Sequence, residues 1–224
     1  MSGVARPVRT EADRTLSLAL PRGALFGSSL DLLDRIGIDT CELRGDSRSL
    51  VFEASGLRLV TMRPSDVPTY VEAGAADLGI TGKDVLLEQA DRAVYELVDL
   101  GYGRCRMVLA ARRGDPSLER AERRLGTMRI ATKYRRIAES HFEATGRQAE
   151  VIEVKGSVEL APLAGLADGI VDLVDTGRTL AENELEVREE ITVCTARLIA
   201  NRVAHKLRAA EIDDLAERLR GASR

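Results

Sequence analysis

The sequence of 224 residues contains no tryptophan, only three phenylalanines and four tyrosines, and its formal net charge is −3. Few stacking aromatics and a nearly neutral balance argue against a dedicated nucleic-acid binder. No run of about 18 uncharged apolar residues occurs, so no membrane-spanning helix is predicted. Apolar residues nevertheless make up 44% of the chain, which is too many for a disordered protein. We therefore expect a globular chain with no nucleic-acid partner and no membrane segment.

Cysteine is equally scarce: Cys41, Cys105 and Cys194 are odd in number and far apart. This excludes a disulfide framework, and without a CxxC pair or paired histidines no metal site formed by direct protein ligation is predicted. Cys105 suits either a position close to a ligand or a buried structural cysteine, and we favour the second. Residues 1–14 are polar and lack the apolar stretch of a secretory signal. We expect them to form a disordered tail, and the protein to be cytoplasmic.

Lysine is the least used basic residue, with four lysines against 29 arginines. Most of this imbalance is interpreted as coding bias, because surface Arg and Lys exchange freely where geometry is loose. Lys83 departs from the bias inside the segment DLGITGKDVL. This exception favours an ammonium group over a guanidinium at this position.

Short apolar runs alternate with segments of helical period along the whole chain. Among the apolar runs, Leu57–Met62, Met128–Thr132 and Thr192–Ala200 predict strands, and the amphipathic stretch Asn201–Leu219 predicts a long helix. This repeated βα pattern predicts an α/β protein with mostly parallel strands and helices on both faces. The number of elements on either side of residue 104 favours two lobes. The charged stretch Arg113–Arg124 is predicted to be a solvated surface helix of the second lobe.

The most informative segment is Ile170–Leu180, IVDLVDTGRTL, in which an apolar strand enters a turn and then a helix. Asp175, Thr176, Gly177, Arg178 and Thr179 supply hydroxyls, a flexible glycine and a positive charge beside the free N–H groups of the helix start. Such an arrangement can bind a phosphate. An ordinary helix start with a threonine cap explains the same residues.

Asp172 precedes this turn on the strand, where a carboxylate can bind ribose hydroxyls or a phosphate-bound Mg²⁺. The segment Asp77–Leu86 repeats the pattern of strand, glycine turn and helix start, with Lys83 and Asp84 at its end. For Asp84, helix capping is the competing explanation. Arg22 and Arg63 each follow a predicted strand. They either face a ligand at the carboxyl end of a sheet or are surface arginines.

At these residues the chain resembles the ATP phosphoribosyltransferases, the first enzymes of histidine biosynthesis. The resemblance runs from about Leu16 to Leu207. The stretch GSVELAPLAGLADGIVDLVDTGRTLAEN at Gly156–Asn183 is similar to the family signature, and DLGITGKDVL, LGYGRCRMVLA and RIATKY are similar to other family blocks. It implies transfer of phosphoribose from phosphoribosyl pyrophosphate (PRPP) to N1 of ATP, with Mg²⁺ on the pyrophosphate.

The resemblance also implies a fold of two lobes like those of type II periplasmic binding proteins, with the active site in the cleft between them. Lobe 1 is then discontinuous, comprising residues 15–104 plus 185–224, because the C-terminal strand and helix return to it. Lobe 2 comprises residues 105–184 and carries the PRPP loop.

Site roles follow from the resemblance position by position. Asp175 through Thr179 match the loop for the PRPP 5′-phosphate, and Asp172 matches the acidic residue on the ribose hydroxyls. Lys83 and Asp84 match a segment facing the nucleotide or ribose, and Tyr134 matches a position expected to stack near the nucleotide. Arg22 and Arg63 match basic positions that neutralise polyphosphate oxygens, and Glu159 supports the signature helix.

Two positions depart from the family pattern, and the chain length suggests a subtype. Ala24 stands where a second basic or polar residue is frequent after the Lys/Arg-Gly pair, and Tyr134-Arg135 stands where Tyr-Pro is frequent. The chain resembles the short form of the family, which lacks a histidine-sensing domain. This implies a regulatory subunit similar to histidyl-tRNA synthetase and a hetero-oligomer, expected to be a hetero-octamer.

Two rival functions remain open at this point. One is a non-catalytic two-lobed module that closes on a small anion. The other is a PRPP-dependent transferase with a different acceptor.

Overall fold

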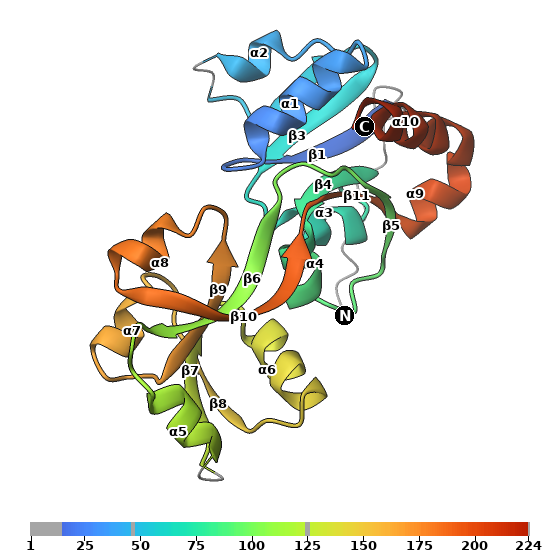
Figure 1. The fold of residues 1–224 in the computed structure, drawn as a ribbon. Helices are drawn as coiled ribbons and strands as arrows, with labels where there is room; N and C mark the ends of the chain where they lie inside the picture. The colour runs from blue at the N-terminus through green and yellow to red at the C-terminus, as the bar shows by residue number, and fades with distance from the viewer. Residues whose placement is uncertain (1–14, 46–47, 124–125, 224) are drawn as a thin grey trace, which may run out of the picture. The chain divides into compact units, whose positions relative to one another are not determined.

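The computed structural model describes residues 15–45, 48–123 and 126–223 (Figure 1). The tail expected at residues 1–14 lies outside these described residues. Internal contacts divide the chain into two compact units. Unit 1 takes the described residues of Met1–Gly82, Arg92–Tyr102 and Ala196–Arg224, and unit 2 takes Lys83–Asp91 and Gly103–Thr195. The expected lobe ranges put residues 83–91, 103–104 and 185–195 with the first lobe, whereas internal contacts group all three segments with unit 2.

Unit 1 contains a six-stranded mixed sheet in the order β2-β3-β1-β4-β11-β5. β1 pairs in parallel with β3 and β4, while β2, β11 and β5 join antiparallel. Its strands are β1 (Leu16–Pro21), β2 (Val51–Ala54), β3 (Leu57–Met62), β4 (Leu78–Gly82), β5 (Val94–Asp99) and β11 (Ala196–Asn201). Its helices are α1 (Phe26–Arg35), α2 (Cys41–Arg44), α3 (Val67–Glu72), α9 (Arg202–Leu207) and α10 (Ala209–Ala222).

The core of unit 1 follows from the alternation of apolar side chains along its central strands. Leu16, Leu18 and Leu20 of β1 all lie in one apolar cluster, into which α1 and α10 also place their buried side chains. On β4, a Cβ at Gly79 would lie 2.6 Å from Val67 Cγ1 and 2.8 Å from Val71 Cγ2 of α3. The absent side chain at Gly79 therefore lets α3 pack closely on the sheet.

Unit 2 contains a five-stranded mixed sheet in the order β10-β6-β9-β7-β8. β7 pairs in parallel with β8 and β9, while β6 pairs antiparallel with β9 and β10. Its strands are β6 (Cys105–Arg112), β7 (Met128–Thr132), β8 (Ala149–Glu153), β9 (Gly169–Val174) and β10 (Leu185–Cys194). Its helices are α4 (Lys83–Glu88), α5 (Ser117–Arg123), α6 (Arg135–Ala144), α7 (Leu160–Leu163) and α8 (Arg178–Glu182).

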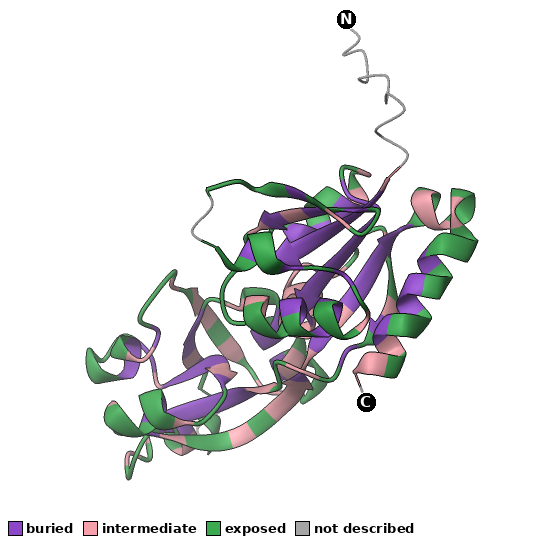
Figure 2. Ribbon diagram, turned by 90° about the horizontal axis from the view of Figure 1, so that it is seen from above, coloured by how far each residue is buried: buried purple, intermediate pink, exposed green. Residues whose placement is uncertain are grey.

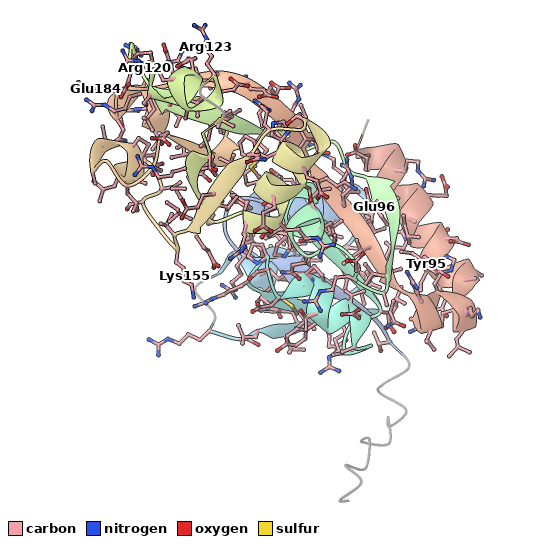
Figure 3. The ribbon with its side chains drawn as sticks, turned by 90° about the horizontal axis from the view of Figure 1, so that it is seen from below. Tyr95, Glu96, Arg120, Arg123, Lys155 and Glu184 are labelled. Carbon is pink, nitrogen blue, oxygen red and sulfur yellow. The ribbon has the colours of Figure 1, made fainter. Side chains whose placement is uncertain are left out.

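Helices cover both faces of the unit 2 sheet. Successive side chains of β6 point to opposite faces, and each set packs against different helices. Met107 and Leu109 join a cluster with side chains of α5 and α6, while Val108 and Ala110 join a second cluster with side chains of α7 and α8. In Figure 2 the central strands of both units are largely buried, and the exposed residues lie mainly on helices, loops and the outer strands. The helix expected in Arg113–Arg124 is α5. Arg120 and Arg123, labelled in Figure 3, lie on its exposed face.

Three expectations from the sequence are wrong. The sheets are mixed rather than mostly parallel, because among the described strand pairings four are parallel and five antiparallel. The single strand expected at Thr192–Ala200 is the end of β10 and most of β11, separated by Thr195. The long helix expected at Asn201–Leu219 is α9 and α10, divided at Arg208, whose φ of −134° is not helical. Within the described residues, no helix is long and apolar enough to cross a membrane.

Candidate active site

The turn between β9 and α8 carries the candidate phosphate-binding residues. β9 ends at Val174, and Gly177 then adopts a left-handed conformation (φ 80°, ψ 1°) at the N-cap of α8. Glycine takes this conformation without the steric cost that a Cβ imposes. Thr176 Oγ1 accepts a weak hydrogen bond from the Arg178 backbone N–H at 3.4 Å. Asp175, Thr176, Arg178 and Thr179 are all exposed, so the turn presents its polar groups to solvent.

The polar groups of this turn are only partly engaged within the chain. The Arg178 guanidinium donates to Glu182 Oε1 at 2.7 Å, one helical turn on, and remains 82% exposed. The Thr179 carbonyl accepts from Asn183 Nδ2 at 2.9 Å. An exposed ion pair of this kind contributes little to stability. Arg178 can therefore exchange Glu182 for an anionic ligand at small cost.

Asp172 lies on β9 just before the turn and is a buried carboxylate, only 7% exposed. Its Oδ1 accepts from the Leu173 backbone N–H at 2.8 Å and lies 3.2 Å from Lys133 Nζ. Burial raises the pKa of Asp172 above its usual value, and the negative charge of Glu159 adds to this rise, while Lys133 opposes it. Glu159 is the N-cap residue of α7. Asp172 is thus a desolvated acceptor with a single cationic partner among the described residues.

Thr132 places Lys133 beside Asp172. Its hydroxyl, at the end of β7, donates to the Val171 carbonyl on β9 at 2.6 Å and accepts from the Tyr134 backbone N–H at 2.8 Å. The bond to Val171 holds the end of β7 against β9. Lys133, the residue after Thr132, therefore contacts the carboxylate of Asp172, the residue after Val171. Lys133 Nζ also lies 5.2 Å from the centroid of the Tyr134 ring, within cation–π range.

Lys133 was not assigned a role from the sequence. The available signal was its rarity, since the same argument that singled out Lys83 applies to it. Its contact with Asp172 joins residues 39 positions apart, and only the strand register reveals it.

Asp84 occupies the first turn of α4. Burial raises the pKa of its carboxyl, while hydrogen bonds from its own backbone N–H and that of Val85 oppose the rise. These bonds are those of an acid at a helix start. The Lys83 backbone N–H donates to the Thr195 carbonyl at 3.0 Å. This bond ties the start of α4 to the residue that follows β10.

Tyr134 is the N-cap residue of α6 and is half-buried. Burial raises the pKa of its phenol, and the negative charges of Asp84 and Asp172 raise it further. Because both carboxylates influence this one phenol, we group Asp84, Lys133, Tyr134 and Asp172, together with the turn Asp175–Thr179, as the candidate site of unit 2.

Arg22 and Arg63 belong to unit 1, each directly after the end of a parallel strand. Arg22 Nε donates to Thr61 Oγ1 at 3.1 Å, and its guanidinium lies 5.5 Å from the centroid of the Phe26 ring. Arg63 is exposed, and within the described part of the chain its side chain makes no hydrogen bond or ion pair. Arg22 and Arg63 follow neighbouring strands, because β1 and β3 pair in parallel from Leu16 opposite Leu57 to Pro21 opposite Met62.

The chemistry available is that of anion and hydroxyl recognition. Among the described residues, no group of three or more His, Cys, Asp or Glu side chains is placed to hold a metal ion. The candidate site of unit 2 combines an exposed polar turn, of the kind suited to anions, with buried or half-buried carboxylates that can accept hydrogen bonds.

Comparison with known proteins identifies the family. A family model described as "HisG: ATP phosphoribosyltransferase" matches residues 63–221. An ATP phosphoribosyltransferase of Rubrobacter xylanophilus is 56% identical over 203 residues, covering 90% of this chain and 94% of the relative. One from Symbiobacterium thermophilum is 50% identical over 209 residues, covering 92% and 93%.

Solved structures give the same family and confirm the fold class. The chain superimposes on the ATP phosphoribosyl transferase (HisG:HisZ) complex from Thermotoga maritima with a TM-score of 0.77 and 36% identity, covering 93% of this chain and 98% of that one. The periplasmic aliphatic sulphonate binding protein SsuA from Escherichia coli has a TM-score of 0.60 at 14% identity, over 93% of this chain and 72% of that one. This second likeness concerns the fold alone and agrees with the predicted two α/β lobes. By sequence and by structure, the chain belongs to the ATP phosphoribosyltransferase family.

Proposed function

We propose that the chain transfers the phosphoribosyl group of PRPP to N1 of ATP, giving phosphoribosyl-ATP and pyrophosphate in the first step of histidine biosynthesis. Family membership supports the reaction. The observation that carries the proposal is the turn Asp175–Thr179 directly after the buried Asp172, because a phosphoribosyl donor requires an anion site next to a hydroxyl acceptor.

In this proposal the residues of unit 2 bind the donor. Backbone N–H groups at the start of α8, with the hydroxyls of Thr176 and Thr179, hold the 5′-phosphate, and Arg178 adds charge. Asp172 accepts hydrogen bonds from the ribose hydroxyls, with Lys133 as its counter-charge. Unit 2 is thus the PRPP-binding lobe.

The remaining predicted residues act on the acceptor and the leaving group. Tyr134 and Asp84 contact the nucleotide or ribose, and Lys83 supplies positive charge on the same segment. Arg22 and Arg63 neutralise polyphosphate oxygens from unit 1. The exposed Arg63, which makes no side-chain bond within the described residues, is available for this role at little cost.

The chain's part in the reaction is positioning and electrostatic stabilisation. Transfer at C1′ develops positive charge on the ribose ring while pyrophosphate departs with negative charge, so oriented charges lower the barrier. N1 of adenine carries a free lone pair, and no general base is required. Mg²⁺ comes with the substrate, held by pyrophosphate oxygens, and supplies charge neutralisation.

A regulatory partner forms part of the proposal. The solved Thermotoga maritima relative is a HisG:HisZ complex, and this chain covers 98% of that relative's chain. We infer that this chain likewise assembles with a HisZ-type subunit, similar to histidyl-tRNA synthetase, into a hetero-octamer in the cytoplasm. Full, histidine-inhibited activity of the chain purified alone would contradict this inference.

Product analysis tests the function directly. The chain is incubated with ATP, PRPP and Mg²⁺, with and without a HisZ-type subunit, and the products are identified by absorbance and mass. Phosphoribosyl-ATP and pyrophosphate are expected. Pyrophosphate release only with another acceptor would indicate the second transferase, and PRPP binding without turnover in either mixture would indicate a solute-binding module.

Substitution of Thr179 tests the donor site. Thr179→Ala removes one phosphate donor, so we expect the KM for PRPP to rise while the KM for ATP stays close to that of the wild type. A hydrogen bond to a charged group contributes about 1.5–3 kcal/mol. An unchanged KM for PRPP would remove Thr179 from the phosphate site.

A further inference from the structure

Cys105 and Cys194 are directly opposite each other across the antiparallel pair β6 and β10, although 89 residues separate them in the sequence. Opposite residues of an antiparallel pair have Cα atoms about 4.5–5.5 Å apart and side chains on the same face of the sheet. A disulfide requires Cα atoms roughly 4.4–6.8 Å apart. The ladder therefore holds the two cysteines within bonding range without any movement of the backbone.

The Cys105 side chain also contacts Cys194. Its thiol donates to the Cys194 backbone carbonyl oxygen at 3.9 Å. Hydrogen bonding by the Cys194 side chain lowers the pKa of the Cys105 thiol, while burial and the charges of Asp84 and Asp175 oppose that effect. The contact between Cys105 and the Cys194 carbonyl is a second observation beside the register.

The two cysteines differ in solvent exposure, and this difference decides which thiol an oxidant reaches first. Cys105 is half-buried, whereas Cys194 is only 1% exposed. A small-molecule oxidant therefore reaches Cys105 first, and Cys194 is reached only by the neighbouring sulfur. Cys41, the remaining cysteine, is exposed on α2 in unit 1 and has no part in this pair.

We propose that Cys105 and Cys194 form a thiol–disulfide pair that is oxidised by low-molecular-weight disulfides and reduced by thiols. The Cys105 thiolate attacks one sulfur of the small disulfide, whose S–S bond breaks and releases one thiolate. The Cys194 thiol then loses its proton to solvent, attacks Cys105 Sγ and displaces the second thiolate. In sum, two protein thiols are oxidised to one disulfide, and one small disulfide is reduced to two thiols.

The environment of the pair gives oxidation a local consequence. The ionised Cys105 sulfur carries negative charge beside Asp84 and Asp175, and its charge also acts on Tyr134. Disulfide formation removes this charge from a cluster of carboxylates. Disulfides in reducing compartments are usually reversible. Because Cys105 is partly accessible, small thiols can reach this pair and reduce it again.

The test uses the full chain carrying Cys41→Ser, equilibrated in buffers of graded oxidised to reduced glutathione, quenched with an alkylating agent and analysed by mass and peptide mapping. We expect a species that has lost two hydrogens, with a Cys105–Cys194 cross-link and neither thiol alkylated, and its return to two alkylated thiols after dithiothreitol. The wild type, mapped in parallel, gives the same result independently of the Cys41 substitution.

The matched control is Cys194→Ser, which removes the resolving thiol. In this variant, oxidation is expected to stop at a stable glutathione adduct on Cys105. A stable adduct on Cys105 when Cys194 is present, or alkylation of both thiols under the most oxidising buffer, would overturn the proposal. Because the assay reads thiol chemistry and not turnover, its outcome is separate from that of the proposed transferase reaction.

Discussion

Opposing influences act on Asp172, and their balance decides its charge. Burial disfavours the ionised carboxylate, whereas Lys133, 3.2 Å away, favours it. Glu159 and the phenol of Tyr134 also interact electrostatically with Asp172. In the proposed reaction the ionised form is the one that accepts ribose hydroxyls, so Lys133 acts as a positioning residue for the charge of Asp172.

Lys133→Met is expected to make activity more sensitive to acid. Removing the cation raises the pKa of Asp172 further, so the carboxylate is protonated at a higher pH and the acid limb of the profile moves upward. The pH dependence of kcat/KM for PRPP measures this shift. Lys133→Arg keeps the positive charge and should restore much of the profile, and Lys206→Met, an exposed lysine of α9, should change nothing. An unmoved acid limb would refute this role of Lys133.

Asp172→Asn is expected to reduce turnover without destabilising the fold. Losing hydrogen bonds from the ribose to a charged acceptor costs about 1.5–3 kcal/mol, or roughly 10- to 150-fold in rate. A raised pKa means that the ionised carboxylate is unfavourable in the folded state, so its removal should not lower the Tm. Steady-state kinetics measures the loss of turnover, and thermal unfolding measures the Tm. Turnover equal to wild type would exclude Asp172 from the reaction.

Among the secondary-structure elements, those built on regular apolar runs follow from the sequence. The runs Leu57–Met62 and Met128–Thr132 predict β3 and β7 with the residue bounds that the structure shows. The four-residue elements α2 and β2 were not predicted, because such short segments leave too little periodic signal. β10 was predicted only at its end, because this edge strand is half-exposed, carries several charges and has two register irregularities.

The candidate site divides in the same way. A buried strand entering a glycine turn and a helix start is local in sequence, so Asp172 and the turn Asp175–Thr179 were recognisable. The pairing of Lys133 with Asp172 and of Cys105 with Cys194 depends on strand register between distant segments. No local pattern encodes such a register, so these contacts required the structure.

The turn before α8 depends on one left-handed glycine, and Gly177→Ala should impair it. A Cβ there meets only Val174 Cγ1, at 3.8 Å, so the expected cost is backbone strain of about 1–2 kcal/mol rather than a clash. The KM for PRPP should rise. Gly165→Ala is the matched control, since Gly165 has φ +72° with open space around its Cβ but lies outside the turn. Equal effects of both variants on the KM for PRPP would show that the turn does not bind PRPP.

The packing of α3 on β4 depends on a glycine for a different reason. Gly79→Ala places a Cβ within 3.0 Å of Val67 and Val71 on α3, so we expect destabilisation of about 1–3 kcal/mol from overpacking. Gly27→Ala in α1 meets nothing within 4 Å and should stabilise by roughly 0.5–1 kcal/mol through helix propensity. Denaturant unfolding of both variants measures these changes. The same sign of effect for both would contradict this account of the packing.

At the scale of the whole molecule, PRPP binding should raise the free energy of unfolding. A ligand that binds only the folded state, at a free concentration of about 100 times its Kd, adds roughly 2.7 kcal/mol to that free energy. Because the proposed donor-binding residues lie mainly in unit 2, PRPP without ATP should slow amide hydrogen exchange most at the β9–α8 turn. Protection confined to unit 1 would contradict the assignment of the PRPP loop.

The strand order of unit 1 has a consequence for how the chain acquires its fold during synthesis. β11 lies between β4 and β5 in the sheet, yet it follows all of unit 2 in the sequence. Every residue of unit 2 has therefore emerged from the ribosome before the strand that joins β4 to β5. Until Ala196–Asn201 arrives, the nascent chain exposes the apolar edge of β4, whose residues are all buried in the finished protein. Unit 2 can thus complete its sheet first, and the unit that begins synthesis is the last to close.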